Sequence, residues 1–145
     1  MTKNLDKEGL SSIVDNYQLF YVDLWGVVHN GVHLHEEAIK ALKGITNKGK
    51  DYVLLTNAPR PNNAVKSFLE KLGMEKEIRD HVFTSGEAAL TYLKKNLLDK
   101  SFFHIGSLRD FDLFKDFEKM KLDQIEKCDY ILCTGLFDNH HEDLK

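Results

Sequence analysis

The stretch FYVDLWGVV, residues 20–28, decides the fold of this 145-residue chain. An apolar run leads to a single aspartate, Asp23, and a glycine, Gly26, follows three residues later. This pattern predicts a strand that delivers a carboxylate to a tight loop. Residues 18–24 are apolar almost throughout, which is typical of a strand that is buried on both faces of a parallel sheet.

Strand-like and helix-like segments alternate through the rest of the chain. A helix is expected over about residues 35–47, because apolar residues recur there at spacings of three and four and two glutamates occupy the first turn. Further strands are expected at 52–55, 82–83, 101–105 and 129–134, and further helices after Pro61, from Thr84 to about Leu97, and over 110–120. This alternation predicts an α/β fold with a mostly parallel sheet.

Composition excludes several classes of protein. The chain is 42% hydrophobic and 30% charged, with 20 basic and 23 acidic side chains and a net charge of -3. It therefore lacks the excess of basic residues that would indicate nucleic-acid binding. No apolar stretch approaches the roughly 20 residues of a membrane span, and the polar start of the chain does not resemble a secretory signal. Cys128 and Cys133 are not spaced as a redox or metal pair. We therefore expect a cytoplasmic protein with reduced thiols, which binds neither nucleic acid nor membrane.

Polar residues follow the first two predicted strands where each strand ends. Asp23 ends the first, and Thr56 and Asn57 end the second. Because parallel strands joined by a right-handed crossover end at the same edge of a sheet, these residues are expected to face one crevice. Arg60, just beyond Asn57, is a candidate anion contact at the edge of this crevice.

An acid and a hydroxyl at one crevice suit phosphoryl transfer. A carboxylate can attack phosphorus and hold the phosphoryl group as an acyl phosphate. The hydroxyl of Thr56 and backbone N–H groups of residues 24–27 are candidate donors to the phosphoryl oxygens. A divalent cation is needed beside Asp23, because carboxylate and phosphate repel each other. Mg²⁺ suits this role, with the backbone carbonyl of Trp25 as a second protein ligand.

Two motifs at this separation resemble those of a known family. YVDLWGV (21–27), followed by Gly31, and LLTN (54–57) resemble the first two motifs of the haloacid dehalogenase superfamily, with subfamily IIA, the p-nitrophenylphosphatase-like hydrolases, as the nearest match. TSG (84–86) supports the match, and FHIG (103–106) and DYILCTG (129–135) resemble the first strands of the cap inserted in that subfamily.

The resemblance implies an architecture and a set of roles. Residues 1–87 correspond to the N-terminal part of a Rossmann-like core with a parallel sheet, and residues 88–145 to the start of an inserted α/β cap. Asp23 is implied as nucleophile and Mg²⁺ ligand, and Thr56 as a phosphate ligand with Asn57 beside it. The implied substrate is a small phosphorylated compound.

Two departures from the family pattern leave an alternative open. The family's phosphatases carry a second aspartate two residues after the nucleophile as general acid and base, and this chain has Trp25 there, whose indole can only donate a hydrogen bond. The later motifs, a lysine and further acids, match no segment of the chain. The chain is therefore either a hydrolase of this type or an inactive truncated or split product. The second alternative includes an interaction module that self-associates or pairs with a complementing C-terminal half.

Two groups of histidines are candidate metal ligands. His29, His33 and His35 lie close together in the sequence, and His140 and His141 lie near its end. Imidazoles bind transition metals, but neither group has a complete ligand set with a recognisable spacing. We expect solvated loop and helix-start residues at 29–35 and exposed charge at the end of the chain.

Overall fold

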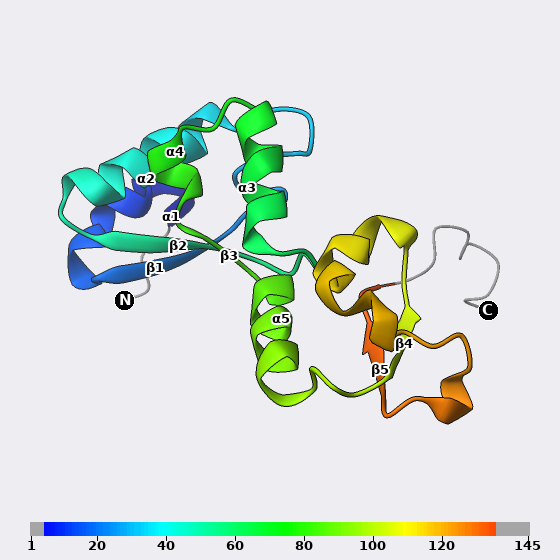
Figure 1. Cartoon of the computed structure of the whole chain (residues 1–145). Coiled ribbons are helices and arrows are strands. Elements are labelled where there is room, and N and C mark those ends of the chain that lie inside the picture. The colour runs from blue at the N-terminus through cyan, green and yellow to red at the C-terminus, as the bar shows by residue number, and fades with distance from the viewer. Residues whose placement is uncertain (1–4, 136–145) are drawn as a thin grey trace, which may run out of the picture. The chain divides into compact units, whose positions relative to one another are not determined.

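The computed structural model describes residues 5–135, apart from the side chains of residues 108 and 109 (Figure 1). The chain forms two compact units, the first of residues 1–56 and 65–83 and the second of residues 57–64 and 84–145. The predicted domain boundary at residue 87 stays a prediction. The histidines at 140 and 141 lie outside the described residues.

The first unit is a small parallel sheet with helices. Its elements are α1 (Leu5–Glu8), the 3₁₀ segments η1 (Leu10–Ser12) and η2 (Val14–Asn16), β1 (Leu19–Asp23), α2 (Glu36–Asn47), β2 (Asp51–Thr56), α3 (Asn62–Lys71), α4 (Lys76–Arg79) and β3 (Val82–Thr84). The strand order is β1-β2-β3, and β1 and β2 are parallel. The predicted α/β fold with a parallel sheet is confirmed.

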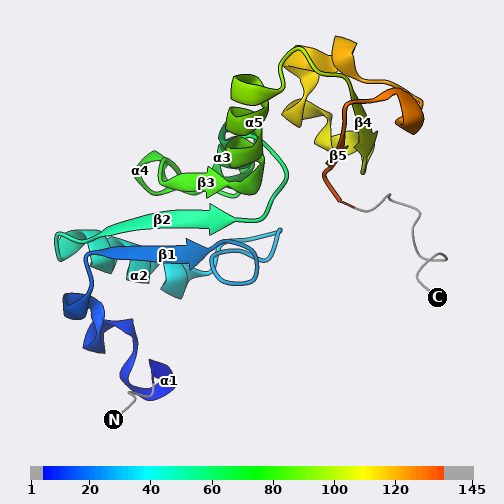
Figure 2. The ribbon, with the colours of Figure 1, turned by 90° about the horizontal axis from the view of Figure 1, so that it is seen from below.

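Two helices of the first unit, α2 and α4, lie on one face of its sheet. Figure 1 shows α2 and α4 on the same side of β1 and β2, and in Figure 2, seen from below, the two strands lie in front of α2. Leu42 and Ile45 of α2 and Leu54 of β2 are almost completely buried. The predicted spacing of apolar residues in α2 thus produces a stripe that faces the sheet.

Gly44 lowers the stability of α2, and the fold does not require a glycine at this position. A Cβ atom built on Gly44 would meet no heavy atom within 4 Å, and its φ angle is not positive. We expect the Gly44→Ala variant to be about 0.5–1 kcal/mol more stable, because glycine loses more backbone entropy in a helix than alanine does. Urea unfolding monitored by circular dichroism measures the change, and a variant no more stable than the parent would contradict it.

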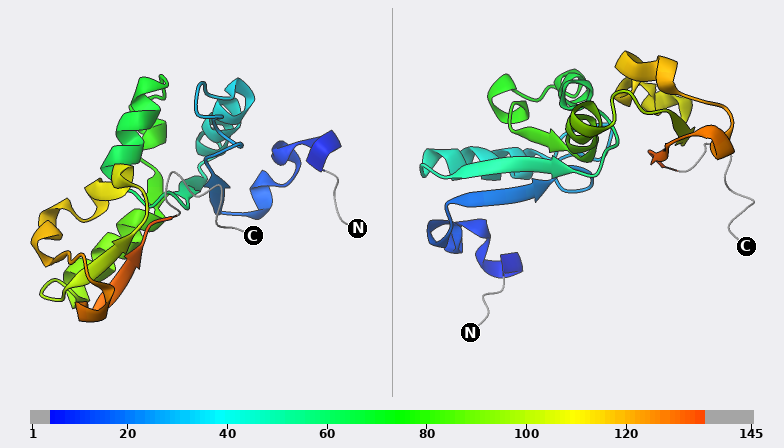
Figure 3. Two further views of the ribbon diagram at one scale, coloured as in Figure 1. Left: turned by 90° about the vertical axis from the view of Figure 1, so that its right-hand side faces the viewer. Right: turned by 60° about the horizontal axis from the view of Figure 1, so that its bottom comes forward.

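The second unit consists of one long helix, a strand pair and three 3₁₀ segments. Its elements are α5 (Ser85–Asn96), β4 (Phe102–Ile105), η3 (Leu108–Leu113), η4 (Lys115–Met120), η5 (Ile125–Lys127) and β5 (Tyr130–Cys133). β4 and β5 are parallel neighbours, seen side by side in Figure 3. The strands expected at 101–105 and 129–134 are therefore confirmed, and they form a separate two-stranded sheet.

The helix expected over residues 110–120 is wrong in detail. The segment forms the two 3₁₀ pieces η3 and η4, and Phe117 inside η4 has the non-helical angles φ −131° and ψ 27°. Phe114 and Phe117 both place their rings against Phe102, at centroid distances of 5.4 and 5.7 Å. Aromatic residues and aspartates have modest helix propensity, so packing against Phe102 prevails over helical regularity.

Thr84 and Glu87 have the sequence spacing of a capping box, and the start of α5 forms half of one. The hydroxyl of Thr84 accepts a hydrogen bond from the backbone N–H of Glu87 at 2.9 Å. In a complete capping box the carboxylate of Glu87 would accept from the N–H of Thr84. Here the side-chain oxygen of Asn62 accepts from that N–H, and the carboxylate of Glu87 accepts from the N–H of Asn62. The cap therefore also ties residues 57–64 to α5.

Other features of the described residues concern membranes and thiols. Between residues 5 and 135, no helix has the length and apolar character needed to cross a bilayer. Cys128 and Cys133 are both free.

Candidate functional site

Asp23 lies at the carboxyl end of β1 with its side chain exposed. Its Oδ1 atom accepts a hydrogen bond from the backbone N–H of Leu24 at 2.8 Å. Leu24 is almost completely buried, so this N–H is a fixed donor. The backbone thus holds Oδ1, and this bond fixes the orientation of the carboxylate and of its second oxygen, Oδ2.

Thr56 ends the neighbouring strand β2. Asp23 pairs with Leu55 in the register, so Thr56 lies one residue beyond the partner of Asp23. Because side chains alternate along a strand, Asp23 shares a face with Leu55, whereas Thr56, at 9% exposure, lies on the helix-covered face with Leu54. The structure therefore brings Asp23 and Thr56 to one edge of the sheet, from opposite faces.

The loop after Asp23 uses most of its own N–H groups. Leu24 O accepts from the N–H groups of Val27, Val28 and His29, and Gly26 N–H donates to His29 O. The N–H groups of Leu24, Gly26 and Val27, which the sequence offers as candidate donors to the phosphoryl oxygens, are therefore already bonded within the chain. The sequence could not show this, because a turn that closes on itself and a turn that binds an anion use the same residue types.

Trp25 projects from this loop and is 63% exposed. Its indole lies against Gly31, where an added Cβ would be 2.6 Å from the ring atom Cη2, and Gly31 has a φ of +90°. The ring also meets the imidazole of His29 edge-on, with centroids 5.4 Å apart. Trp25 is therefore a loop aromatic outside the core, and Gly31 is required both for its backbone angle and for the indole.

His29 is buried, at 4% exposure, which corrects the expectation that it is solvated. Its ring is edge-on to Trp25 on one side and to Phe68 on another, and its Nδ1 accepts a hydrogen bond from the N–H of Gly31 at 3.0 Å. His33, by contrast, is exposed as expected. No sequence signal marked His29, because its burial depends on Phe68, 39 positions away.

Burial lowers the pKa of His29 below its usual value of 6.5; nearby His35 lowers it further, and Asp23 acts in the opposite direction. The folded state therefore disfavours the protonated imidazole. The stability that neutral His29 contributes is present above pH 6.5, the pKa of the unfolded state, and is lost as the pH falls through the lower folded-state pKa.

We expect the chain to be less stable at pH 5 than at pH 7, and the His29→Asn variant to show a smaller difference between these two values. Urea unfolding at both pH values measures the four free energies. An equal loss of stability in the parent chain and the variant would contradict the role of His29. Asparagine retains an acceptor for the N–H of Gly31, so the comparison between the parent and the variant reports the loss of the titrating imidazole.

Asn57 and Arg60 belong to the second compact unit. The backbone carbonyl of Asn57 accepts a hydrogen bond from the hydroxyl of Ser85 at 2.8 Å. The guanidinium of Arg60 lies 3.4 Å from the buried carboxylate of Asp110, so a carboxylate already balances part of its charge. The roles expected for Asn57 and Arg60 at the phosphate stay predictions.

The donors available for a magnesium ion are few in the described residues. Between residues 5 and 135, no group of three or more His, Cys, Asp or Glu side chains could hold a metal. The carboxylate of Asp23 and the carbonyl of Trp25 are hard oxygen ligands two positions apart. Mg²⁺ takes one or two protein ligands and keeps several waters in such sites, so this donor set fits part of a magnesium shell.

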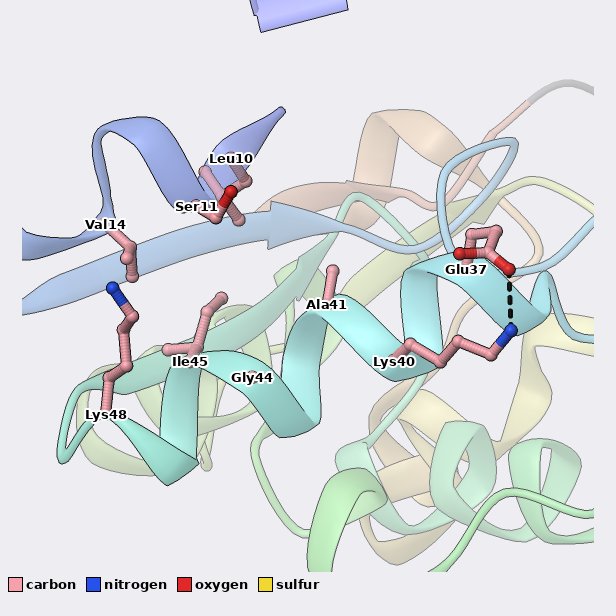
Figure 4. A pocket seen from close by; sticks show the side chains of 9 residues that line it. All are labelled: Leu10, Ser11, Val14, Glu37, Lys40, Ala41, Gly44, Ile45 and Lys48. Atoms are coloured by element: carbon pink, nitrogen blue, oxygen red, sulfur yellow. Dashed lines mark hydrogen bonds and ion pairs between the residues drawn. The ribbon is translucent and has the colours of Figure 1, made fainter. Parts of the chain in front are cut away.

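A cavity of about 350 Å³ lies elsewhere in the first unit, between η1, η2 and α2 (Figure 4). Leu10, Val14 and Ile45 give it an apolar floor, and Lys40 on its rim forms an ion pair with Glu37 at 2.7 Å. None of the residues predicted for the site lines this cavity. The candidate site is therefore the edge of the sheet at Asp23 and Thr56.

Comparison with known proteins identifies a family. Residues 20–119 match the family model described as haloacid dehalogenase-like hydrolase. Phosphoglycolate phosphatase 2 from Arabidopsis thaliana is 34% identical over 110 residues, which cover 70% of this chain and 35% of that protein.

Solved structures show the same fold. A haloacid dehalogenase-like hydrolase from Brucella suis superposes with a TM-score of 0.76 at 32% identity, over 92% of this chain and 48% of that one. The 4-nitrophenylphosphatase from Thermotoga maritima gives 0.62 at 21% identity, over 83% of this chain and 46% of that one. Glycerol phosphate phosphatase from Mycobacterium tuberculosis, solved in complex with magnesium, gives a TM-score of 0.59 at 20% identity, over 86% of this chain and 38% of that one.

The chain spans about a third of the Arabidopsis protein and about half of the Brucella structure. The family match covers more than half of the chain and confirms the resemblance to the haloacid dehalogenase superfamily. The chain therefore belongs to the haloacid dehalogenase-like hydrolases.

Proposed function

We propose that this chain takes part in phosphoryl transfer from a small phosphorylated compound, with Asp23 as the nucleophile. The observation that carries the proposal is the exposed carboxylate at the carboxyl end of β1, oriented by the Leu24 N–H, in a chain of this hydrolase family. Ligands of open α/β sheets bind beyond the carboxyl ends of the strands, which is where Asp23 lies.

The proposed reaction has two steps. In the first, Oδ2 of Asp23 attacks phosphorus, the bond from phosphorus to the leaving oxygen breaks, and that oxygen departs with the electron pair. In the second, water attacks the phosphorus of the aspartyl phosphate, which releases inorganic phosphate and restores the carboxylate. The Thr56 hydroxyl is proposed to donate to a phosphoryl oxygen, and Asn57 and Arg60 to contact the substrate.

Asp23 and the carbonyl of Trp25 are the residues proposed to hold a magnesium ion. When bound, the ion neutralises charge between the carboxylate and the phosphoryl oxygens, which would otherwise repel. The family generally uses Mg²⁺, and the residues at the strand end fit part of its preferred shell.

Trp25 restricts the kinds of substrate this site can handle. Its indole N–H donates a hydrogen bond but cannot exchange a proton with a leaving group or with water. General acid–base catalysis of this kind is typically worth about 10²–10⁴-fold. Esters whose leaving group departs readily as an anion, such as p-nitrophenyl phosphate, are therefore the appropriate first substrates.

Release of phosphate from p-nitrophenyl phosphate tests the proposal. We expect Mg²⁺-dependent release that stops when the ion is removed with EDTA and returns when Mg²⁺ is added again. Release that does not depend on the divalent ion, or that is no faster than in buffer, would overturn the proposed activity for this chain. Fluorescence of Trp25, the only tryptophan, gives a second readout of Mg²⁺ and phosphate binding beside Asp23.

Location and partners are part of the same proposal. Two free cysteines suit a reducing compartment, and we propose the cytoplasm.

Self-association or pairing with a complementing half is the second candidate function, favoured by large apolar side chains exposed on the strands. Sedimentation velocity of the full chain at several concentrations tests self-association, since a monomer at every concentration would exclude it.

A further inference from the structure

Asn30 and Gly31 form the only Asn–Gly pair in the sequence, and they lie in the loop between β1 and α2 (Figure 2). Asn30 is exposed, so water reaches its side chain. Gly31 has a φ of +90° and no Cβ atom, so no side chain of its own shields its backbone nitrogen from the amide of Asn30. Attack of this nitrogen on the carbon Cγ of Asn30 closes a cyclic imide, which makes the pair a candidate for self-modification.

The backbone nitrogen of Gly31 has a base as its hydrogen-bond partner. Its N–H donates to Nδ1 of His29 at 3.0 Å, so Nδ1 presents its lone pair to this proton. The imidazole is held in place by edge-on contacts with the rings of Trp25 and Phe68. Nucleophiles in covalent catalysis are arranged in the same way, with a fixed base within hydrogen-bond reach of the proton that it removes.

The side-chain amide of Asn30 is polarised for this attack. Its Oδ1 atom accepts hydrogen bonds from the backbone N–H groups of Val32 and His33, both at 3.0 Å. Attack on Cγ moves negative charge onto Oδ1, and two donors at this distance stabilise that charge as an oxyanion hole does. The leaving nitrogen, Nδ2, lies 3.2 Å from Nε2 of His33, whose exposed ring exchanges protons with solvent. A nucleophile, a base, two oxyanion donors and a proton source therefore surround one amide.

We propose that Asn30 is a modification site at which the fold promotes loss of the side-chain amide as ammonia. The nitrogen of Gly31 transfers its proton to Nδ1 of His29 and forms the bond to Cγ, while the carbonyl electron pair moves to Oδ1. The bond from Cγ to Nδ2 then breaks, and Nδ2 leaves with that electron pair and takes up a proton through His33. Water opens the cyclic imide at either carbonyl, which leaves an aspartyl or isoaspartyl residue at position 30. Solvent restores both imidazoles, so the net reaction consumes water and releases ammonia.

The modification changes the loop that follows Asp23. Both products place a negative charge at position 30, and the isoaspartyl form also lengthens the main chain by one carbon atom before Gly31. Because the indole of Trp25 lies against Gly31, the longer main chain alters the surroundings of the indole. Fluorescence of Trp25, the only tryptophan, therefore reports the modification. The chemistry does not depend on the proposed phosphoryl transfer, so the two reactions are measured separately.

Peptide mapping by mass spectrometry tests the proposal on the full chain, incubated in neutral buffer and sampled over time. The comparison is the same chain unfolded in guanidinium chloride, which keeps the Asn–Gly pair but displaces His29 and the two N–H donors. We expect the folded chain to lose the amide of Asn30 at least about tenfold faster than the unfolded chain, because a positioned base and oxyanion donors each accelerate such a step. Ammonia released into the buffer is expected to rise in parallel.

Two substitutions separate the base from the rest of the fold. His29→Asn keeps an acceptor for the N–H of Gly31 but cannot take its proton, so we expect the rate to fall to that of the unfolded chain. His81→Asn is the matched control, because His81 is a partly buried histidine of the same unit whose Nδ1 bonds to Tyr52 O, and we expect the parent rate. Circular dichroism first establishes that both variants are folded. If His29→Asn is not, the comparison of the folded and unfolded parent chain decides.

A folded chain that loses the amide no faster than the unfolded chain would overturn the proposal, because the hydrogen bonds would then protect Asn30. Equal rates in His29→Asn and His81→Asn would refute it as well. Ammonia release without a change at position 30 would assign the reaction to another amide and would also contradict it.

Discussion

Asp23→Asn is expected to lower the rate of phosphate release from p-nitrophenyl phosphate by on the order of 10⁴-fold, to the rate in buffer. The amide is a poor nucleophile, so the acyl phosphate cannot form. Its side-chain oxygen can still accept the hydrogen bond from Leu24 N–H, which is 2.8 Å long in the parent chain. The loss therefore reflects the chemistry of one oxygen atom.

Asp15→Asn is the matched control for this prediction. Asp15 is an exposed aspartate of the same unit, and its carboxylate pairs with Lys48 at 3.0 Å. We expect this variant to release phosphate at the parent rate. If both substitutions lower the rate equally, or if Asp23→Asn retains most of it, the assignment of Asp23 as nucleophile is wrong.

Gly86→Ala is expected to have the largest effect on stability, about 3 kcal/mol of destabilisation. Gly86 is buried in the first turn of α5, and its N–H donates to Ala58 O. A Cβ at this position would lie 2.5 Å from the carbonyl oxygen of Arg60 and 2.6 Å from its carbonyl carbon. These are backbone atoms, which cannot move aside as the end of a flexible side chain can.

Urea unfolding monitored by circular dichroism measures the free energy of unfolding, and Gly44→Ala is the comparison variant. Both substitutions add one methyl group to a helical glycine, but Gly44 has open space around it and Gly86 does not. Opposite signs of the two changes in unfolding free energy are expected. A Gly86→Ala variant as stable as the parent would show that residues 57–64 do not approach α5 this closely.

Features encoded by neighbouring residues were predictable from the sequence. The strand ending at Asp23, the stripe of α2 and the capping bond of Thr84 each depend on residues a few positions apart, and each is confirmed. In these cases local propensity and tertiary packing favour the same structure.

Features that depend on distant partners were not predictable. His29 is buried because Phe68 packs against it, and Asn62 completes the cap of α5 from 22 positions before Thr84. The 3₁₀ break at Phe117 arises from contact with Phe102 in another strand. The sequence contains these residues, but it does not contain the fold that brings them together.

The roles of Thr56, Asn57 and Arg60 depend on the substrate as well as on the fold, so they stay predictions. Thr56 belongs to the first compact unit and Asn57 to the second. The backbone of Asn57 is held by Ser85, and Arg60 pairs with Asp110, both in that second unit.

Detection of a phosphoryl group on Asp23 tests the central claim most directly. The chain is incubated with p-nitrophenyl phosphate and Mg²⁺, quenched in acid, digested and analysed by mass spectrometry. Because Trp25 cannot activate water, we expect the acyl phosphate to persist long enough to be found on the peptide that contains Asp23, and to be absent from Asp23→Asn. A phosphoryl group on any other residue, or none in a preparation that releases phosphate, would contradict the proposed nucleophile.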